Sequence, residues 1–117
     1  MKLSKFIIPF FILSCSFLGE SAAIDITVYN NTSNVIIAEI KYVKEDYMKY
    51  EIKPGESYKD GTYATEKKKP SEAFDYIIVT DKSTGAVILD LRGGDLDNTL
   101  TVEHEDETYI HYKLVVQ

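Results

Sequence analysis

Apolar and polar residues alternate along most of the chain after residue 23, with the period of two that is typical of β-strands. The run from Ile24 to Val28 places three apolar side chains on one face of a strand, while Asp25 and Thr27 lie on the other. Similar alternation, or a short run of β-prone residues, recurs to the end of the chain. The expected strands cover residues 24–29, 35–43, 47–52, 58–64, 73–80, 86–91, 98–104 and 108–116. No segment of ten or more residues shows the 3.6-residue period of an amphipathic helix.

Turn-forming residues separate these strands. Asn30-Asn31-Thr32-Ser33 follows the first strand, Pro54-Gly55 follows the third, and residues 81–85 form a loop with Gly near its end. Asp60-Gly61 is expected to interrupt strand 58–64. About eight short strands with a turn every 8–12 residues predict an all-β domain, a two-sheet antiparallel β-sandwich. A small closed β-barrel is the alternative architecture.

Two strands carry more specific expectations. The run Ala86–Leu91 is almost continuously apolar, which is typical of a strand covered on both faces. The last hairpin is expected to turn at residues 105–107, which would place His104 and His111 about three residue pairs apart and on opposite faces. That separation argues against a metal ion shared by the two histidines.

The first half of this pattern resembles bacterial immunoglobulin-like sandwich domains. The first strand ends in Asn-Asn-Thr-Ser, an apolar return strand follows, and the next strand ends in Ile52-Lys53-Pro54-Gly55-Glu56-Ser57. In those domains the chain crosses to the other sheet after a similar Pro-Gly-Glu turn. The resemblance covers residues 24–58 and implies a sandwich fold, and a fold does not by itself define a function.

Residues 1–23 are predicted to form a signal peptide. Lys2 and Lys5 precede an almost wholly apolar stretch, residues 6–18, which is shorter than the ~20 residues that a membrane-spanning helix needs. Ser21-Ala22-Ala23 supplies small residues at the positions that signal peptidase reads. We therefore expect cleavage between Ala23 and Ile24, and a mature domain of residues 24–117 that is secreted or periplasmic.

Cys15 offers an alternative to this processing. Ile12-Leu13-Ser14-Cys15 resembles a lipobox, in which the cysteine is acylated and becomes the first residue of the mature protein. The product would be an envelope lipoprotein held at a membrane surface, and only in that case is a membrane partner expected. Cys15 is the only cysteine, so neither an intramolecular disulfide nor a cysteine-cluster metal site is expected.

Charge and residue types exclude several function classes. The formal net charge is -6, and a nucleic-acid-binding domain is normally basic because it neutralises phosphates. No serine lies in a G-x-S-x-G motif, and no spacing brings a serine to either histidine. We therefore expect no catalytic residue and no cofactor. Asp95, Asp97 and Asn98 supply oxygen atoms of the kind that calcium prefers, without the Gly and the distal Glu of an EF-hand loop, and calcium binding stays open.

The chain is rich in tyrosine, a residue that favours protein interfaces. The candidate binding surface consists of Tyr47, Tyr58, Tyr63, Lys67, Lys68 and Lys69. The expected function is that of an exported, non-enzymatic protein-binding or adaptor module that uses a sheet face or an exposed edge strand. The alternatives are an envelope lipoprotein acylated at Cys15 that serves in complex assembly, and an inhibitor of an extracellular hydrolase that would use residues 65–72 or 92–98 as its loop.

Overall fold

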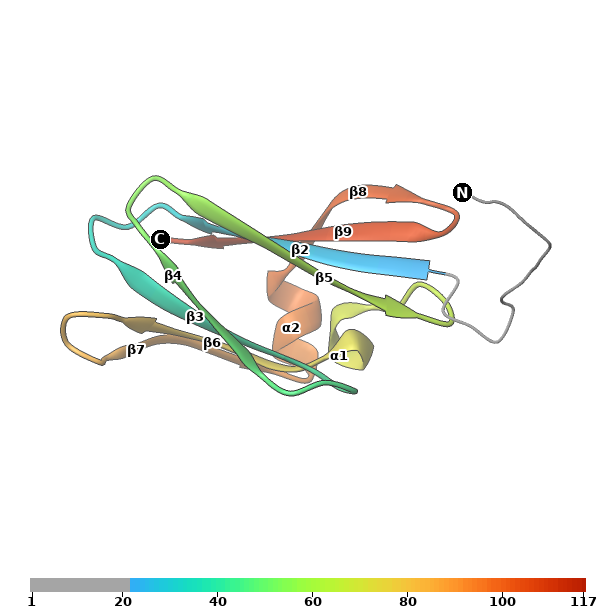
Figure 1. The fold of residues 1–117 in the computed structure, drawn as a ribbon, viewed down its shortest axis with the longest axis horizontal. Helices are drawn as coiled ribbons and strands as arrows, with labels where there is room; N and C mark the ends of the chain where they lie inside the picture. The colour runs from blue at the N-terminus through green and yellow to red at the C-terminus, as the bar shows by residue number, and fades with distance from the viewer. Residues whose placement is uncertain (1–21) are drawn as a thin grey trace.

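The computed structural model describes residues 22–117 and folds them into two packed β-sheets with two short helices between them (Figure 1). The predicted signal peptide up to residue 21 and Cys15 lie outside the described residues. The strands are β2 (Ala22–Asn30), β3 (Ile36–Tyr42), β4 (Met48–Ile52), β5 (Ser57–Ala64), β6 (Phe74–Asp81), β7 (Val87–Arg92), β8 (Thr101–Asp106) and β9 (Tyr109–Val116). The prediction of an eight-stranded β-sandwich is confirmed. In the described part of the chain, no helix is long and apolar enough to span a membrane.

Each sheet contains four strands. The first sheet has the order β5-β2-β9-β8 and the second has the order β4-β3-β6-β7. All neighbouring strands are antiparallel except β2 and β9, which run parallel and join the first strand of the fold to the last. The chain crosses between sheets at Pro54-Gly55, as the immunoglobulin-like resemblance implies. Gly55 allows this turn because its φ of 79° is unfavourable for other residues.

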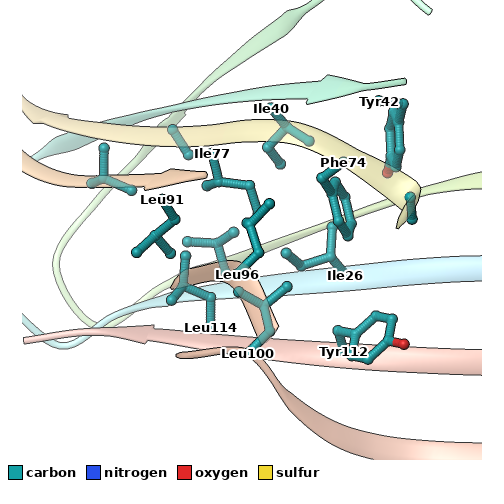
Figure 2. Close-up of a cluster of buried hydrophobic side chains, with 14 of the residues drawn as sticks. Ile26, Ile40, Tyr42, Phe74, Ile77, Leu91, Leu96, Leu100, Tyr112 and Leu114 are labelled. Carbon is teal, nitrogen blue, oxygen red and sulfur yellow. The ribbon is translucent and has the colours of Figure 1, made fainter. Parts of the chain in front are cut away.

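The core lies between the two sheets and receives alternate side chains from both. Figure 2 shows Ile26 and Leu114 of the first sheet facing Ile40 and Ile77 of the second. Burial of these aliphatic side chains, at about 25 cal/mol for each Å² of apolar surface, supplies the main driving force for folding. The strand pattern was predictable because the buried positions of β2, β3 and β9 follow the expected period of two.

Two short helices occur where the sequence predicted loops and the start of a strand. Helix α1 spans Pro70–Ala73 and helix α2 spans Gly94–Thr99, so the strand expected from residue 98 begins only at Thr101. Gly93, with a φ of 54°, redirects the chain into α2. Leu96 and Leu100 are four residues apart, a spacing that brings both side chains to one side of a helical turn and here into the core. The burial of these two leucines explains why α2 forms, although its sequence shows no helical period.

Strand β7 is an edge strand in which Leu91 is the only buried residue, so the expectation that it is covered on both faces is wrong. It pairs only with β6, and Val87 is 61% exposed. Thr80 pairs with Val87 and Val79 pairs with Leu89, so Ile88 is an extra residue in a β-bulge. The consecutive residues Ile88 and Leu89 both pack against the core. The bulge therefore accounts for an unbroken apolar run in a strand that has only one neighbour.

Strand β5 continues through Asp60-Gly61, where an interruption was expected. The carboxylate of Asp60 accepts hydrogen bonds from the hydroxyl groups of Tyr42, at 2.9 Å, and Tyr50, at 3.0 Å. A Cβ atom on Gly61 would lie 2.1 Å from the Asp25 carboxylate on the neighbouring strand. Both residues thus serve contacts with other strands rather than a turn.

The buried tyrosines predict a loss of stability at alkaline pH. Burial, followed by the charge of Asp60, raises the pKa of Tyr42 above the usual value of 10.0, and burial, followed by the hydrogen bond to Asp60, raises the pKa of Tyr50. Burial raises the pKa of Tyr112 to about 12. The unfolded chain releases these protons near pH 10, whereas the folded protein retains them. This contribution to stability is therefore complete below about pH 10 and is lost as the pH rises towards 12.

Urea unfolding between about pH 8 and pH 12 measures this effect, and the midpoint is expected to fall above pH 10. The Tyr42→Phe variant should lose less stability over the same interval because one of the shifted groups is absent. Equal slopes for the two proteins would contradict the assignment to Tyr42.

Candidate binding sites

A pocket of about 200 Å³ lies at the end of the sandwich where β5 ends and β2 begins. Its buried floor consists of Ile24 from β2, Ala64 from β5 and Ala73 from α1. Val43, after β3, and Tyr63, on β5, stand at its rim with exposed fractions of 47% and 66%. Four separate segments of the chain thus build one apolar pocket that is open to solvent.

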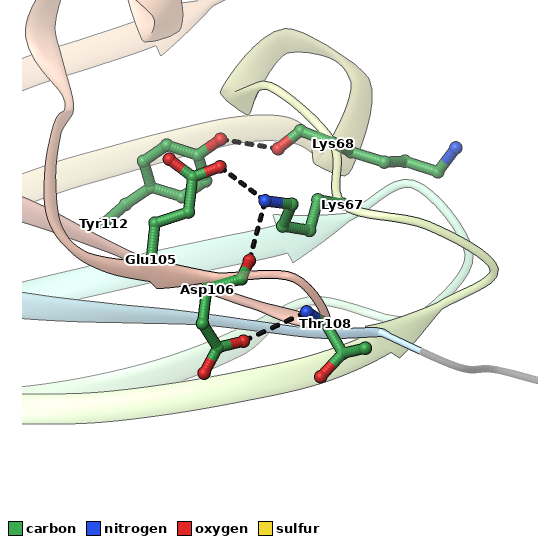
Figure 3. Close-up of polar contacts among 6 residues, drawn as sticks. All are labelled: Lys67, Lys68, Glu105, Asp106, Thr108 and Tyr112. Carbon is green, nitrogen blue, oxygen red and sulfur yellow. Dashed lines mark hydrogen bonds and ion pairs between the residues drawn. The ribbon is translucent and has the colours of Figure 1, made fainter.

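Hydrogen bonds hold the walls of this pocket in place. The Val43 amide donates to the Ala73 carbonyl over 3.0 Å and fixes the chain after β3 to α1. The Tyr112 hydroxyl donates to the Lys68 carbonyl over 2.5 Å and fixes the segment before α1 to β9 (Figure 3). The space exists because Ala64 and Ala73 are small, while the backbone around them is tied to both sheets.

The polar groups of the pocket are Lys44, Lys68, Glu72 and Thr62. Neither lysine forms an ion pair with any residue among 22–117. The Glu72 carboxylate accepts a hydrogen bond from the backbone amide of Lys69 over 3.3 Å, and the Thr62 hydroxyl donates to the Glu45 carboxylate. The acidic groups near the pocket thus already accept hydrogen bonds, whereas the two ammonium groups lack an acidic partner within the described part of the chain.

The predicted tyrosine and lysine surface is divided by the fold. Tyr63 and Lys68 meet at the pocket. Tyr58 stacks on Tyr50 with ring centroids 3.9 Å apart. Tyr47 is exposed on the chain just before β4, with the ammonium group of Lys49 lying 5.9 Å from its ring.

The three consecutive lysines have three different environments. Lys67 donates to the Glu105 carboxylate and to the Asp106 carbonyl, each at 2.7 Å. Figure 3 shows the Lys68 side chain extending in the opposite direction from Lys67. Lys69 is the residue that precedes α1. They therefore do not act as one basic patch.

Asp95, Asp97 and Asn98 lie on α2 rather than around an open loop. The Asp97 carboxylate accepts a hydrogen bond from the Ser71 amide in the first turn of α1, at 2.9 Å, and hydrogen bonds from Ser71 lower its pKa. Among residues 22–117, no three His, Cys, Asp or Glu side chains gather in a way that could hold a metal ion. The observed role of Asp97 is to join the two helices.

The two histidines are cross-strand neighbours, so their predicted separation is wrong. The hairpin turns at residues 107–108, and this register places His104 directly opposite His111. His111 Nε2 lies 2.6 Å from the Thr27 hydroxyl, and its Nδ1 lies 3.2 Å from the Tyr109 hydroxyl. Thr27 lies on β2 and is buried, so its contact with His111 joins β2 to β9 on the outer face of the first sheet.

The predicted cleavage site falls within the first strand. Ala22 is buried and pairs with Ala64, and the Ala23 amide donates to the Thr108 carbonyl over 2.8 Å. Cleavage after Ala23 would remove both residues from β2, whereas processing at Cys15 would leave the strand intact. The intact mass of the protein purified from its native source distinguishes the two predictions.

No family model matches the chain, and no curated protein shows significant sequence similarity to it. The function must therefore be inferred from the geometry of the fold.

Proposed function

We propose that the chain is an exported, non-enzymatic binding module that recognises a partner protein by strand addition at β7. An extended segment of the partner would pair with the open side of this edge strand, so that backbone hydrogen bonds give affinity and side-chain contacts give selectivity. The observation that carries the proposal is the run of three consecutive apolar residues at the start of the edge strand β7, residues 87–89, of which Val87 is 61% exposed.

The two sheets have four edges, formed by β5, β8, β4 and β7. Charged residues are distributed along β4, β5 and β8, and such charges discourage pairing with another chain. The first half of β7, residues 87–89, contains only apolar side chains. Its two charged residues, Asp90 and Arg92, form an ion pair with each other at 2.8 Å. This edge therefore offers apolar surface next to unpaired backbone groups.

The bulge at Ile88 supports selective rather than indiscriminate pairing. A bulge changes the spacing and twist of an edge, so an incoming strand must match it. At the other end of β7, Arg92 lies over the ring of Tyr76, 4.8 Å from its centroid, and the Tyr76 hydroxyl donates to Glu39 over 2.6 Å. These contacts hold the side chains of Arg92 and Tyr76 in place next to β7, so a partner would meet an ordered surface there.

The inhibitor alternative receives no comparable support. Each of the segments 65–72 and 92–98, which would supply its loop, contains helical residues. The hydrogen bond from Ser71 to Asp97 joins these helices to each other.

Site-specific photocrosslinking in the native envelope or culture fluid tests the strand-addition proposal. A photoreactive residue at Val87 is expected to give one discrete adduct with another protein. The same group at Lys49, an exposed position on the edge strand β4, is the matched control and should give none. The additional substitution Ala86→Lys, at an exposed residue directly before β7, should reduce the Val87 adduct severalfold, because it introduces a charge at the edge. Equal adducts at both positions, or no adduct at Val87, would contradict the proposal.

A further inference from the structure

The pocket at the end of β5 has the size and lining of a site for a small apolar group. Its volume of about 200 Å³ exceeds the roughly 150 Å³ of an engineered apolar cavity that takes up benzene. Ile24, Ala64 and Ala73 form its floor and offer no polar side chain. Water gains few hydrogen bonds on such a floor, so an apolar group displaces it at little cost. The open rim leaves room for a polar head outside.

The charges at the rim select the head group. Lys41, Lys67 and Lys82 are each paired with a carboxylate within 3.1 Å, whereas Lys44 and Lys68 form no ion pair with residues 22–117. The formal net charge of the chain is -6, yet two positively charged side chains, Lys44 and Lys68, line this one pocket. An anion at the rim would complement both ammonium groups.

The charge balance of the lining favours an anion, because Lys44 and Lys68 outnumber its one carboxylate, Glu72. Glu72 lines the pocket, but its carboxylate accepts the Lys69 amide at the start of α1. Glu45 follows Lys44 in the sequence and accepts the Thr62 hydroxyl. Both carboxylates therefore have hydrogen-bond partners within the protein.

We infer that this pocket binds a small amphipathic carboxylate, with its apolar body on the alanine floor and its carboxylate between Lys44 and Lys68. The apolar body is limited to about the size of one aromatic ring or a chain of roughly eight carbons. This site lies apart from β7, and its occupancy is independent of strand addition.

Nuclear magnetic resonance titration of the purified protein with octanoate tests this inference. Octanoate should shift the amide resonances of Val43, Ala64 and Ala73 in a saturable manner. Octanol and octylammonium share the same chain and serve as neutral and cationic comparisons. The affinity is expected to decrease from octanoate to octanol to octylammonium, because the ammonium groups of Lys44 and Lys68 attract only the anion.

Matched variants separate the head-group site from the apolar floor. Lys44→Glu combined with Lys68→Glu should weaken octanoate binding by about tenfold or more. Lys53→Glu makes the same change of charge in the β4–β5 turn, at the opposite end of the sandwich (Figure 1), and should leave affinity unchanged. Ala73→Leu fills the pocket and should abolish the saturable shifts. If Ala73→Leu does not fold, the two charge variants still decide the matter.

The inference is overturned if octanoate produces no saturable shifts at the pocket, or if the three ligands bind equally. It is also overturned if a folded Ala73→Leu protein binds octanoate as the unmodified protein does. Crosslinking at Val87 reports on β7 and would be unaffected by any of these results.

Discussion

Replacing Asn30 with leucine is expected to lower the free energy of unfolding by about 3 kcal/mol or more. Asn30 is fully buried at the end of β2, and its side chain uses all of its hydrogen-bonding groups. Its amide nitrogen donates to the carbonyls of Asn34 and Ile52, at 2.8 and 2.9 Å. Its amide oxygen accepts from the backbone and the hydroxyl of Thr32, at 2.9 and 2.6 Å. Leucine is similar in size but would bury no hydrogen-bonding group, so the buried Ile52 carbonyl and the half-buried donors of Thr32 would lose their partner.

Asn30 has this large effect because it holds two turns together. Its backbone amide donates to the Glu56 carbonyl, and its carbonyl accepts from Gly55, both in the turn between β4 and β5. Its side chain reaches Asn34 in the turn between β2 and β3 and Ile52 at the end of β4. Asn30 thus forms hydrogen bonds with two turns by which the chain passes between the two sheets.

Urea unfolding at neutral pH measures the effect of Asn30→Leu. Asn31→Ala is the matched control, since Asn31 is exposed and its backbone bond to the Val116 carbonyl survives the change. This control should change the unfolding free energy by less than about 0.5 kcal/mol. Asn30→Asp should also be destabilising, because it places a carboxylate next to two carbonyl oxygens. Equal midpoints for Asn30→Leu and Asn31→Ala would show that the buried bonds contribute little.

The strands were predictable because each is encoded locally. The alternation of Ile24, Ile26 and Val28 fixes which face of β2 is buried, whatever the strand pairs with. Asn30 was also recognisable as the start of a turn. That its side chain is buried and connects two turns depends on Ile52, which lies 22 residues away, and no local pattern encodes that contact.

Features that depend on strand order or on a single inserted residue were mispredicted. The apolar run of β7 was interpreted as a doubly covered strand, but a bulge at Ile88 turns consecutive residues inward. The hairpin turn was placed too early by one to two residues, which separated His104 from His111. A shift of one residue changes every pairing in a hairpin, so such errors follow from small uncertainties in turn length.

The candidate pocket was also only partly predictable from the sequence. Residue type identified Tyr63 and Lys68 as candidates, and both lie at the pocket. Val43, Ala64 and Ala73 gave no signal, since alanine is unremarkable in any sequence and the pocket arises only when four separate segments meet. The pocket is a space left by small side chains from separate segments, and no local sequence pattern encodes such a space.

Replacing Leu96 with alanine is expected to cost about 3 kcal/mol, within the usual range for a buried leucine. Leu96 is 0% exposed and lies between the sheets, with Leu91 and Leu114 around it (Figure 2). Its environment is packed on all sides, so truncation leaves a cavity that the two hydrogen-bonded sheets cannot close. The neighbouring Asp95 is exposed, and Asp95→Ala should cost less than about 0.5 kcal/mol.

This pair of variants also distinguishes the helix α2 from a calcium loop. If residues 95–98 served to bind calcium, Asp95→Ala and Asp97→Ala would abolish a calcium-dependent rise in the melting temperature. If the segment serves to insert Leu96 into the core, Leu96→Ala is the damaging change whether calcium or a chelator is present. Asp97→Ala then costs about 1 kcal/mol in both conditions, because it removes only the hydrogen bond to the first turn of α1. Thermal unfolding of the three variants, each with calcium and with chelator, decides between these roles. A calcium-dependent cost for Asp95→Ala as large as that of Leu96→Ala would show that α2 is a ligand-binding segment and not a packing element.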